Sequence, residues 1–117
     1  MNFFTNSIIT LAFASTLAAN AYAQGRYEVE IVNWSPWTIT HVRMSPVGAD
    51  TWGRDLLGSG VLRADYMVTV QPDRRQGCYY DLKVTFANGD TEEVRDFNIC
   101  SATAIQVHED GADVVEA

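Results

Sequence analysis

No charged side chain precedes Arg26, which sets the beginning of the chain apart from the rest. Residues 8–19 are mostly apolar, but polar residues interrupt them and they fall short of the ~20 residues of a membrane span. The absence of cysteine near Ala23 disfavours a lipid-anchored lipoprotein. Residues 21–23 read Ala-Tyr-Ala, an A-x-A cleavage pattern, so we expect a signal peptide over 1–23, cleaved after Ala23. A retained anchor is the alternative, because the first residues lack the usual Lys or Arg.

The common motifs of enzyme sites are also missing. His41 and His108 are the only histidines, and neither has a neighbour at metal-ligand spacing. The chain contains neither a G-x-S-x-G motif nor a D-x-[DN]-x-[DN]-G calcium loop. We therefore expect no catalytic residue, no metal and no cofactor. The alternative is a small metal-dependent or toxin-like exported enzyme, which tightly bound metal in the purified protein would indicate.

The residues that follow the predicted cleavage point, 24–117, are enough for one domain. A domain of this size has a marginal core without additional support. All 8 basic and all 15 acidic residues lie in it, for a net charge of −7, which disfavours nucleic acids and anionic membrane surfaces as partners. In an exported protein the cysteine pair Cys78 and Cys100 is typical of a disulfide. We expect a periplasmic or secreted protein whose partner is another protein; its oligomeric state stays open.

The apolar residues of this domain alternate with a period of two, which is typical of strands. Residues 27–31 and 78–86 show the clearest alternation. Residues 37–44 change phase once, so we expect a β-bulge there. The pattern predicts an all-β fold, a small antiparallel β-sandwich of immunoglobulin-like architecture with six to seven strands. The acidic tail, 109–117, is expected to be flexible.

Asn88-Gly89 is the strongest hairpin signal in the chain, because both residues tolerate positive φ. A two-residue turn at this position would place Cys78 opposite Ile99. One bulge in the returning strand would move Cys78 opposite Cys100 and bring the two sulfur atoms within bonding distance. A crosslink across this loop would contribute ~3 kcal/mol to stability.

The strand pattern does not explain residues 45–62, which contain four glycines and a tryptophan. We expect this loop to act as a plug, with its apolar side chains under the edge of the sandwich, although ordered loops of this length are often functional. The expected plug residues are Trp52, Asp55, Leu56 and Leu57.

The motifs Ser45-Pro46, WGRDLLG at 52–58, Leu62, CYYDL at 78–82, Gly89 and Cys100 stand in this order along the chain. Together they resemble a group of small, uncharacterised exported bacterial proteins with the pattern SP, WGxDxLG, a leucine, CxYDL, a turn glycine and a final cysteine. Those proteins tend to have Pro-Gly before the third clear strand, where this chain has Arg63-Ala64-Asp65, so the departure concerns the turn type and not the fold. The resemblance implies no activity and no catalytic residues.

Binding remains as the expected function. Trp34 and Trp37 flank a turn that Pro36 stiffens, and exposed indoles are common anchors of protein interfaces. We expect a non-catalytic interaction module with Trp34 and Trp37 in its interface. The basic pair Arg74 and Arg75 is the next candidate. The alternative for both indoles is that they fold back onto the core.

Overall fold

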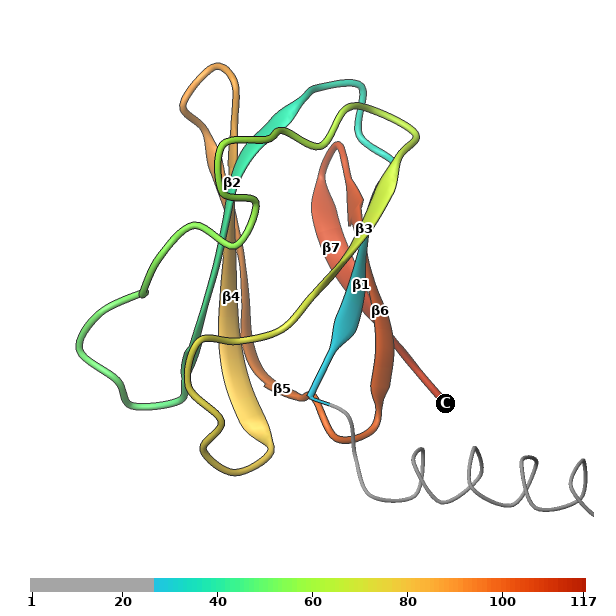
Figure 1. Cartoon of the computed structure of the whole chain (residues 1–117). Helices are drawn as coiled ribbons and strands as arrows, with labels where there is room; N and C mark the ends of the chain where they lie inside the picture. The colour runs from blue at the N-terminus through green and yellow to red at the C-terminus, as the bar shows by residue number, and fades with distance from the viewer. Residues whose placement is uncertain (1–26) are drawn as a thin grey trace, which may run out of the picture.

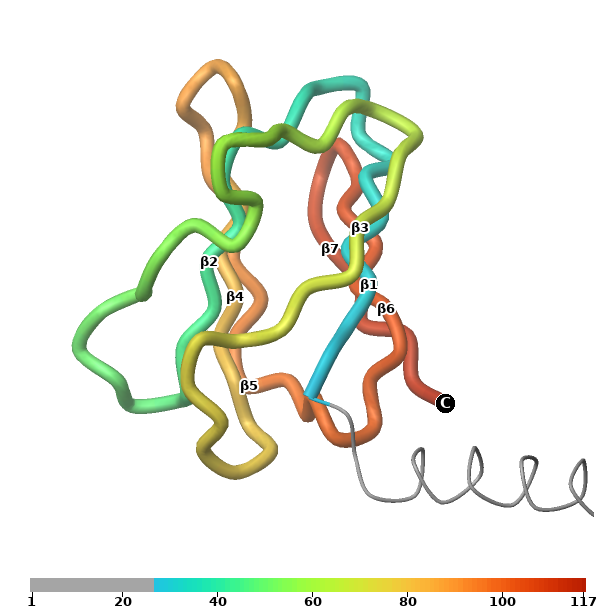
Figure 2. Tube along the Cα trace, in the orientation of Figure 1, coloured from blue at the N-terminus to red at the C-terminus, as the bar shows by residue number. Residues whose placement is uncertain are grey.

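The computed structural model describes residues 27–117, which form two packed β-sheets without a helix (Figures 1 and 2). The first sheet has the order β3 (Met67–Val70), β1 (Val29–Asn33), β6 (Ala102–His108) and β7 (Gly111–Glu116). The second has the order β2 (Ile39–Pro46), β4 (Tyr79–Phe86) and β5 (Thr91–Asn98). The predicted β-sandwich of six to seven strands with one disulfide is confirmed. The predicted signal peptide lies outside the described residues.

The core lies between the sheets and follows the alternation in the sequence. On β4 the inward residues are buried, while Lys83 and Thr85 are turned outward and partly exposed. The same alternation places apolar side chains of β1 and β6 against them, so burial holds the two layers together. The fully buried core side chains include Val29, Ile31, Ile39, Val42, Tyr80, Leu82, Val84, Ile105 and Val107.

Two details of pairing concern the sequence predictions. The predicted bulge in β2 is confirmed, because the register with β4 shifts between Ile39 and His41. The sandwich is not wholly antiparallel, because β1 pairs with β6 in parallel. The two strands lie far apart in the chain, so no local turn motif in the sequence predicts that they pair.

The turn between β4 and β5 is longer than predicted. Phe86 N–H donates to the Asp90 carbonyl at 2.8 Å, and Gly89 N–H donates to the Phe86 carbonyl at 2.9 Å. Three residues, 87–89, therefore form the loop, with Gly89 at φ +94°. A type I turn followed by a residue with positive φ is a common three-residue hairpin connection. The prediction of a two-residue turn is wrong.

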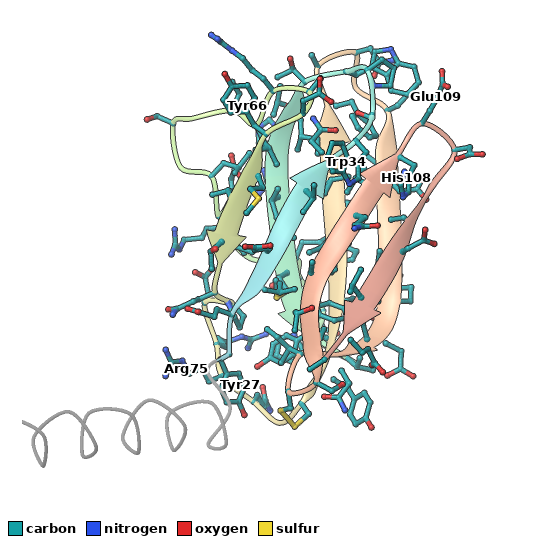
Figure 3. All side chains as sticks on the ribbon, turned by 90° about the vertical axis from the view of Figure 1, so that its right-hand side faces the viewer. Tyr27, Trp34, Tyr66, Arg75, His108 and Glu109 are labelled. Atoms are coloured by element: carbon teal, nitrogen blue, oxygen red, sulfur yellow. A yellow bond between two sulfur atoms is a disulfide. The ribbon has the colours of Figure 1, made fainter. Side chains whose placement is uncertain are left out.

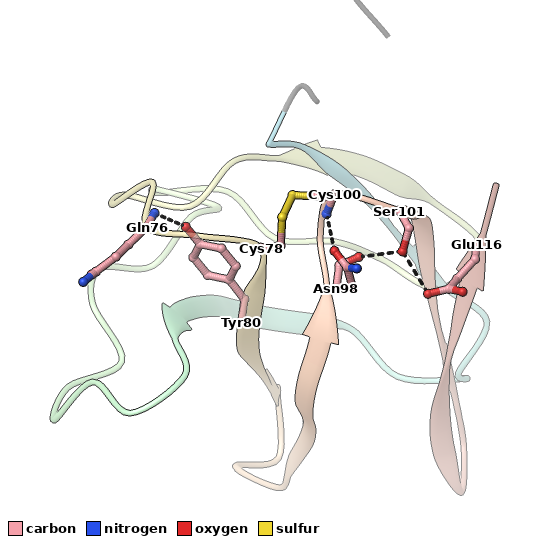
Figure 4. Close-up of a disulfide and its surroundings, with 7 residues drawn as sticks. All are labelled: Gln76, Cys78, Tyr80, Asn98, Cys100, Ser101 and Glu116. Atoms are coloured by element: carbon pink, nitrogen blue, oxygen red, sulfur yellow. Dashed lines mark hydrogen bonds between the residues drawn. A yellow bond between two sulfur atoms is a disulfide. The ribbon is translucent and has the colours of Figure 1, made fainter. Parts of the chain in front are cut away.

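The predicted bulge on the returning strand is confirmed, and the disulfide with it. The β4–β5 register shifts by one residue, with Asp96 at φ +56° in the bulged stretch of β5. Ile99 N–H donates to the Cys78 carbonyl at 2.8 Å, so Ile99 lies opposite Cys78 and Cys100 lies one residue beyond. The predicted placement of Cys78 opposite Cys100 is therefore wrong, because the extra residue in the turn cancels the shift that the bulge introduces. Cys78 and Cys100 have Cα atoms 5.3 Å apart and are bonded (Figure 4). The disulfide indicates an oxidising, extracytoplasmic environment.

The expected flexible tail is instead an ordered strand. Residues 111–116 form β7 and pair antiparallel with β6 through a tight turn at 109–110. Ala112 and Val114 pack against the core, whereas Asp113 and Glu116 point to solvent. The acidic residues of this segment are therefore the exposed ones of a turn and a half-buried strand, and the prediction of a flexible tail is wrong.

Candidate functional site

The turn between β1 and β2 is held from inside by two buried polar side chains, Asn33 and Ser35. Asn33 Oδ1 accepts from the Ser35 N–H at 3.1 Å and from the Ser35 hydroxyl at 2.6 Å. Asn33 Nδ2 donates to the carbonyls of Trp37, at 2.7 Å, and Leu62, at 3.0 Å. Because the buried groups satisfy one another and Pro36 restricts φ, the backbone of this turn has little freedom.

This rigid turn presents both indoles to solvent. Trp34 is 51% exposed and Trp37 is 40% exposed, so neither folds back fully onto the core. Trp37 rests edge-to-face against Phe86, with ring centroids 5.7 Å apart and an interplanar angle of 73°. The two side chains meet the structural condition for an interface, while their binding role stays a prediction.

An apolar groove that the sequence analysis missed adjoins this turn. It has a volume of about 460 Å³ and lies between β3 and the segment 56–63. We call the turn between β1 and β2 the tryptophan turn. Asn33 N–H, at the start of this turn, donates at 2.9 Å to the carbonyl of Tyr66, which lines the groove. The tryptophan turn and the groove are therefore joined by a hydrogen bond. Its rim includes exposed Val61, Tyr66 and Met67. The sequence contained one signal that could have predicted this groove. Met67 is apolar, although the alternation along its strand turns its side chain toward solvent.

We define the aromatic end of the molecule as this groove rim together with the tryptophan turn. These two segments carry several exposed large apolar side chains, and Figure 3 shows Trp34 and Tyr66 at the same end of the sandwich. Such a cluster is a common feature of protein-binding surfaces. The aromatic end comprises Trp34, Trp37, Val61, Tyr66 and Met67.

The structure does not bring Arg74 and Arg75 to this surface. Figure 3 shows Arg75 at the opposite end from Trp34. The loop is fixed there by the Tyr80 hydroxyl, which donates to the Arg74 carbonyl at 2.8 Å and accepts from the Gln76 N–H at 2.6 Å. The Arg75 guanidinium lies over the Tyr27 ring, 5.7 Å from its centroid. The four candidate interface residues therefore form two separate surfaces.

The turn before β3 keeps the geometry that Pro-Gly would supply. Tyr66 N–H donates to the Arg63 carbonyl at 3.2 Å, and Asp65 adopts φ +70° at the third position of this turn. A positive φ at that position is the requirement of a type II turn, which aspartate tolerates better than most residues. Ala64-Asp65 therefore supports the same turn type.

Within the predicted plug, Asp55 and its neighbours cover the edge of β2. Asp55 Oδ1 accepts from the N–H groups of Val42 and Leu57, each at 3.0 Å. Leu56 N–H donates to the Val42 carbonyl at 2.7 Å, and Leu56 and Leu57 pack against the core. The loop thus occupies backbone groups that an edge strand would otherwise offer to another chain. For these three residues the structure agrees with a structural plug.

For Trp52 the plug prediction is wrong, because its ring does not pack against the core. The ring lies against two cationic side chains of the outer sheet face, 5.2 Å from Lys83 Nζ and 4.9 Å from Arg95 Cζ. Arg95 donates to Glu93 at 2.6 Å and to Asp81 at 3.2 Å. The pKa of the Arg95 guanidinium is raised above its ordinary value, chiefly by the hydrogen bond to Glu93. Trp52 therefore joins the loop to the outside of the β2–β4–β5 sheet.

Arg54 attaches the same loop to Asp73, in the segment before β4. Arg54 donates from its backbone N–H, at 3.2 Å, and from its side chain to the Asp73 carboxylate. Gly53 has φ +81°, and a Cβ atom at that position would lie 3.3 Å from Asp73 Oδ2. The positive φ favours glycine at this position, and a larger residue would also require the Asp73 carboxylate to shift slightly.

Titratable side chains form no metal-binding cluster in the part of the chain that the structure describes. His41 Nδ1 lies 3.0 Å from the Thr40 hydroxyl, and His108 Nε2 lies 3.4 Å from Asp113 Oδ2 at the surface. Between residues 27 and 117, every buried side-chain nitrogen and oxygen atom has a hydrogen-bond partner. Nor do these residues include a helix long and apolar enough to cross a membrane.

Comparison with protein-family models, with curated proteins and with solved structures found no match to this chain. The candidate site therefore depends on the geometry described above.

Proposed function

We propose that this chain is an exported, non-catalytic binding module that recognises another protein through its aromatic end. The observation that carries the proposal is the pair of half-exposed indoles on a turn fixed by buried Asn33 and Ser35. Because the turn is already ordered, little conformational entropy is lost when Trp34 and Trp37 are fixed against a partner. Tryptophan in such a position is a frequent hot spot.

The proposal also includes a location outside the cytoplasm. The disulfide supports an oxidising environment, and the A-x-A motif that ends at Ala23 supports export with cleavage before Gln24. We place the mature module in the periplasm or the surrounding medium, with a net charge of −7 that keeps it away from anionic surfaces.

The test is quantitative capture of the partner from a cell-envelope extract. Trp34→Ala and Trp37→Ala should each weaken capture by about 2 kcal/mol or more, the size of a hot-spot loss. Tyr79→Ala is the matched control, because Tyr79 is also an exposed aromatic residue but lies at the other end of β4 from Phe86, the neighbour of Trp37. Equal capture by both tryptophan variants and the wild type, with all of them folded, would refute this surface.

A further inference from the structure

The four outer strands of the two sheets differ in how their edges are protected. β5 and β7 contact each other across the sandwich, and both carry exposed carboxylates. Charges on an outer strand discourage pairing with another chain. The carboxylates are Glu93 and Asp96 on β5, and Asp113 and Glu116 on β7. The edge of β2 is covered instead by Asp55 and Leu56, as described above.

β3 is the remaining outer strand, and it has neither protection. Residues 67–70 read Met-Val-Thr-Val and contain no charge.

The hydrogen bonds of the neighbouring strand β1 show which backbone groups of β3 have no partner in the sheet. Asn33 N–H donates toward β3, to Tyr66, whereas Trp34 N–H donates toward β6, to Val107. Ile31, two residues before Asn33, therefore also faces β3 with its backbone groups.

Val68 is the register partner of Ile31, so its N–H and C=O groups point toward β1. Since these groups alternate along a strand, those of Met67 and Thr69 point away from the sheet. Both side chains are also exposed, Met67 to 57%. The open side of β3 thus offers backbone donors and acceptors at two positions.

The apolar groove lies along this open side. Met67 and Val68 form its β3 wall, and Leu56, Leu57 and Leu62 line it from the loop that covers β2. A strand added to β3 would direct every second side chain toward these leucines and the others toward solvent. The groove therefore has the shape and chemistry for alternate apolar side chains of an extended segment.

Charge distinguishes the possible occupants. Arg63 is the one charged residue lining the groove; it is exposed and has no ion pair among residues 27–117. A carboxylate on the occupant would complement it. A second copy of this chain is disfavoured because two molecules of net charge −7 repel each other.

We propose that β3 receives an extended segment of the partner protein as an added strand, with apolar side chains at alternate positions and an acidic residue beside Arg63. This inference rests on the proposed function, since the groove forms part of the aromatic end. It adds the backbone of β3 and the Arg63 guanidinium to the recognition surface.

The experiment uses a phage-displayed library of random 12-residue peptides selected on the purified, disulfide-bonded protein. Selected peptides should alternate apolar and polar residues and contain Asp or Glu. Thr69→Pro should weaken their binding about tenfold or more, because proline removes an outward N–H without removing a bond to β1. Thr69→Val is the matched control, since it keeps that N–H and should bind within about twofold of the wild type.

Arg63→Glu is a second variant that does not touch the pairing of β3 with β1. Selection on this variant should replace Asp and Glu by Lys and Arg in the peptides. The absence of any enriched peptide would overturn the proposal. So would equal binding to Thr69→Pro and to the wild type, or a dimer in analytical ultracentrifugation that Thr69→Pro dissociates.

The two proposals fail in different ways. If Trp34→Ala weakens partner capture while Thr69→Pro and Arg63→Glu do not, the aromatic end binds but the added strand is refuted. If Thr69→Pro and Arg63→Glu weaken capture while both tryptophan variants do not, β3 is the binding element and the tryptophan hot spot is refuted. The melting temperature and the absence of free thiols establish that each variant is folded.

Discussion

Asp55 allows a direct test of how the long loop stabilises the sandwich. Its carboxylate accepts from the backbone N–H groups of Val42 and Leu57, each at 3.0 Å. Hydrogen bonds to a charged acceptor contribute about 1.5–3 kcal/mol each. Asp55 is only partly buried, so we take the lower end of that range and expect Asp55→Ala to reduce the free energy of unfolding by about 3 kcal/mol.

Two further substitutions separate the carboxylate from other effects. Asp55→Asn keeps a neutral oxygen at the same position and should cost only about 1 kcal/mol, because neutral hydrogen bonds are weaker. Asp50→Ala, an exposed acid in the same loop, is the control and should change stability by less than about 0.5 kcal/mol.

The measurement is urea unfolding followed by tryptophan fluorescence, with the slope of the transition compared between variants. Asp55→Ala should also self-associate at high concentration, because it uncovers the backbone of β2. A loss below about 1 kcal/mol in Asp55→Ala, or equal losses in Asp55→Ala and Asp50→Ala, would refute the role of this carboxylate as the cover of the β2 edge.

Three further predictions test other parts of the chain. Cys100→Ser should lower the free energy of unfolding by about 3 kcal/mol, since the disulfide joins residues 22 apart; a negligible shift in melting temperature would contradict this. Trp52→Ala should cost about 1–2 kcal/mol, because two exposed cation–π contacts are lost without a core cavity; a loss above about 3 kcal/mol in urea unfolding would show that Trp52 is a core residue. The intact mass of the exported protein should correspond to a chain that begins at Gln24, and recovery of a membrane-bound chain that begins at Met1 would contradict cleavage.

Local patterns along the chain were enough to predict the features that depend on neighbouring residues. The alternation in 78–86 identified the inward face of β4, and the change of phase after Ile39 identified the bulge in β2. The paired cysteines were enough to predict the disulfide, and the bulge in β5 was predicted as well. The register was not, because the turn at 87–89 is one residue longer than predicted and leaves Cys78 opposite Ile99. These features follow from the two-residue period of a strand, which is written locally in the chain.

The candidate site depended on contacts between distant segments, which no local pattern contains. Only the fold showed that Trp34 and Arg75 lie at opposite ends and that Tyr66 lies beside the tryptophan turn. Composition suggested a flexible acidic tail after residue 108, yet β7 is held because β6 leaves a free edge beside it.

The same reason applies to the edges of the sheets. No residue beside Asp55 in the sequence predicts its role. That role exists only because the loop brings the Asp55 carboxylate back to the N–H of Val42, 13 residues earlier in the chain. The open side of β3 likewise follows from which strands pair with β1, and that pairing is decided when the two sheets pack and bury their apolar faces together.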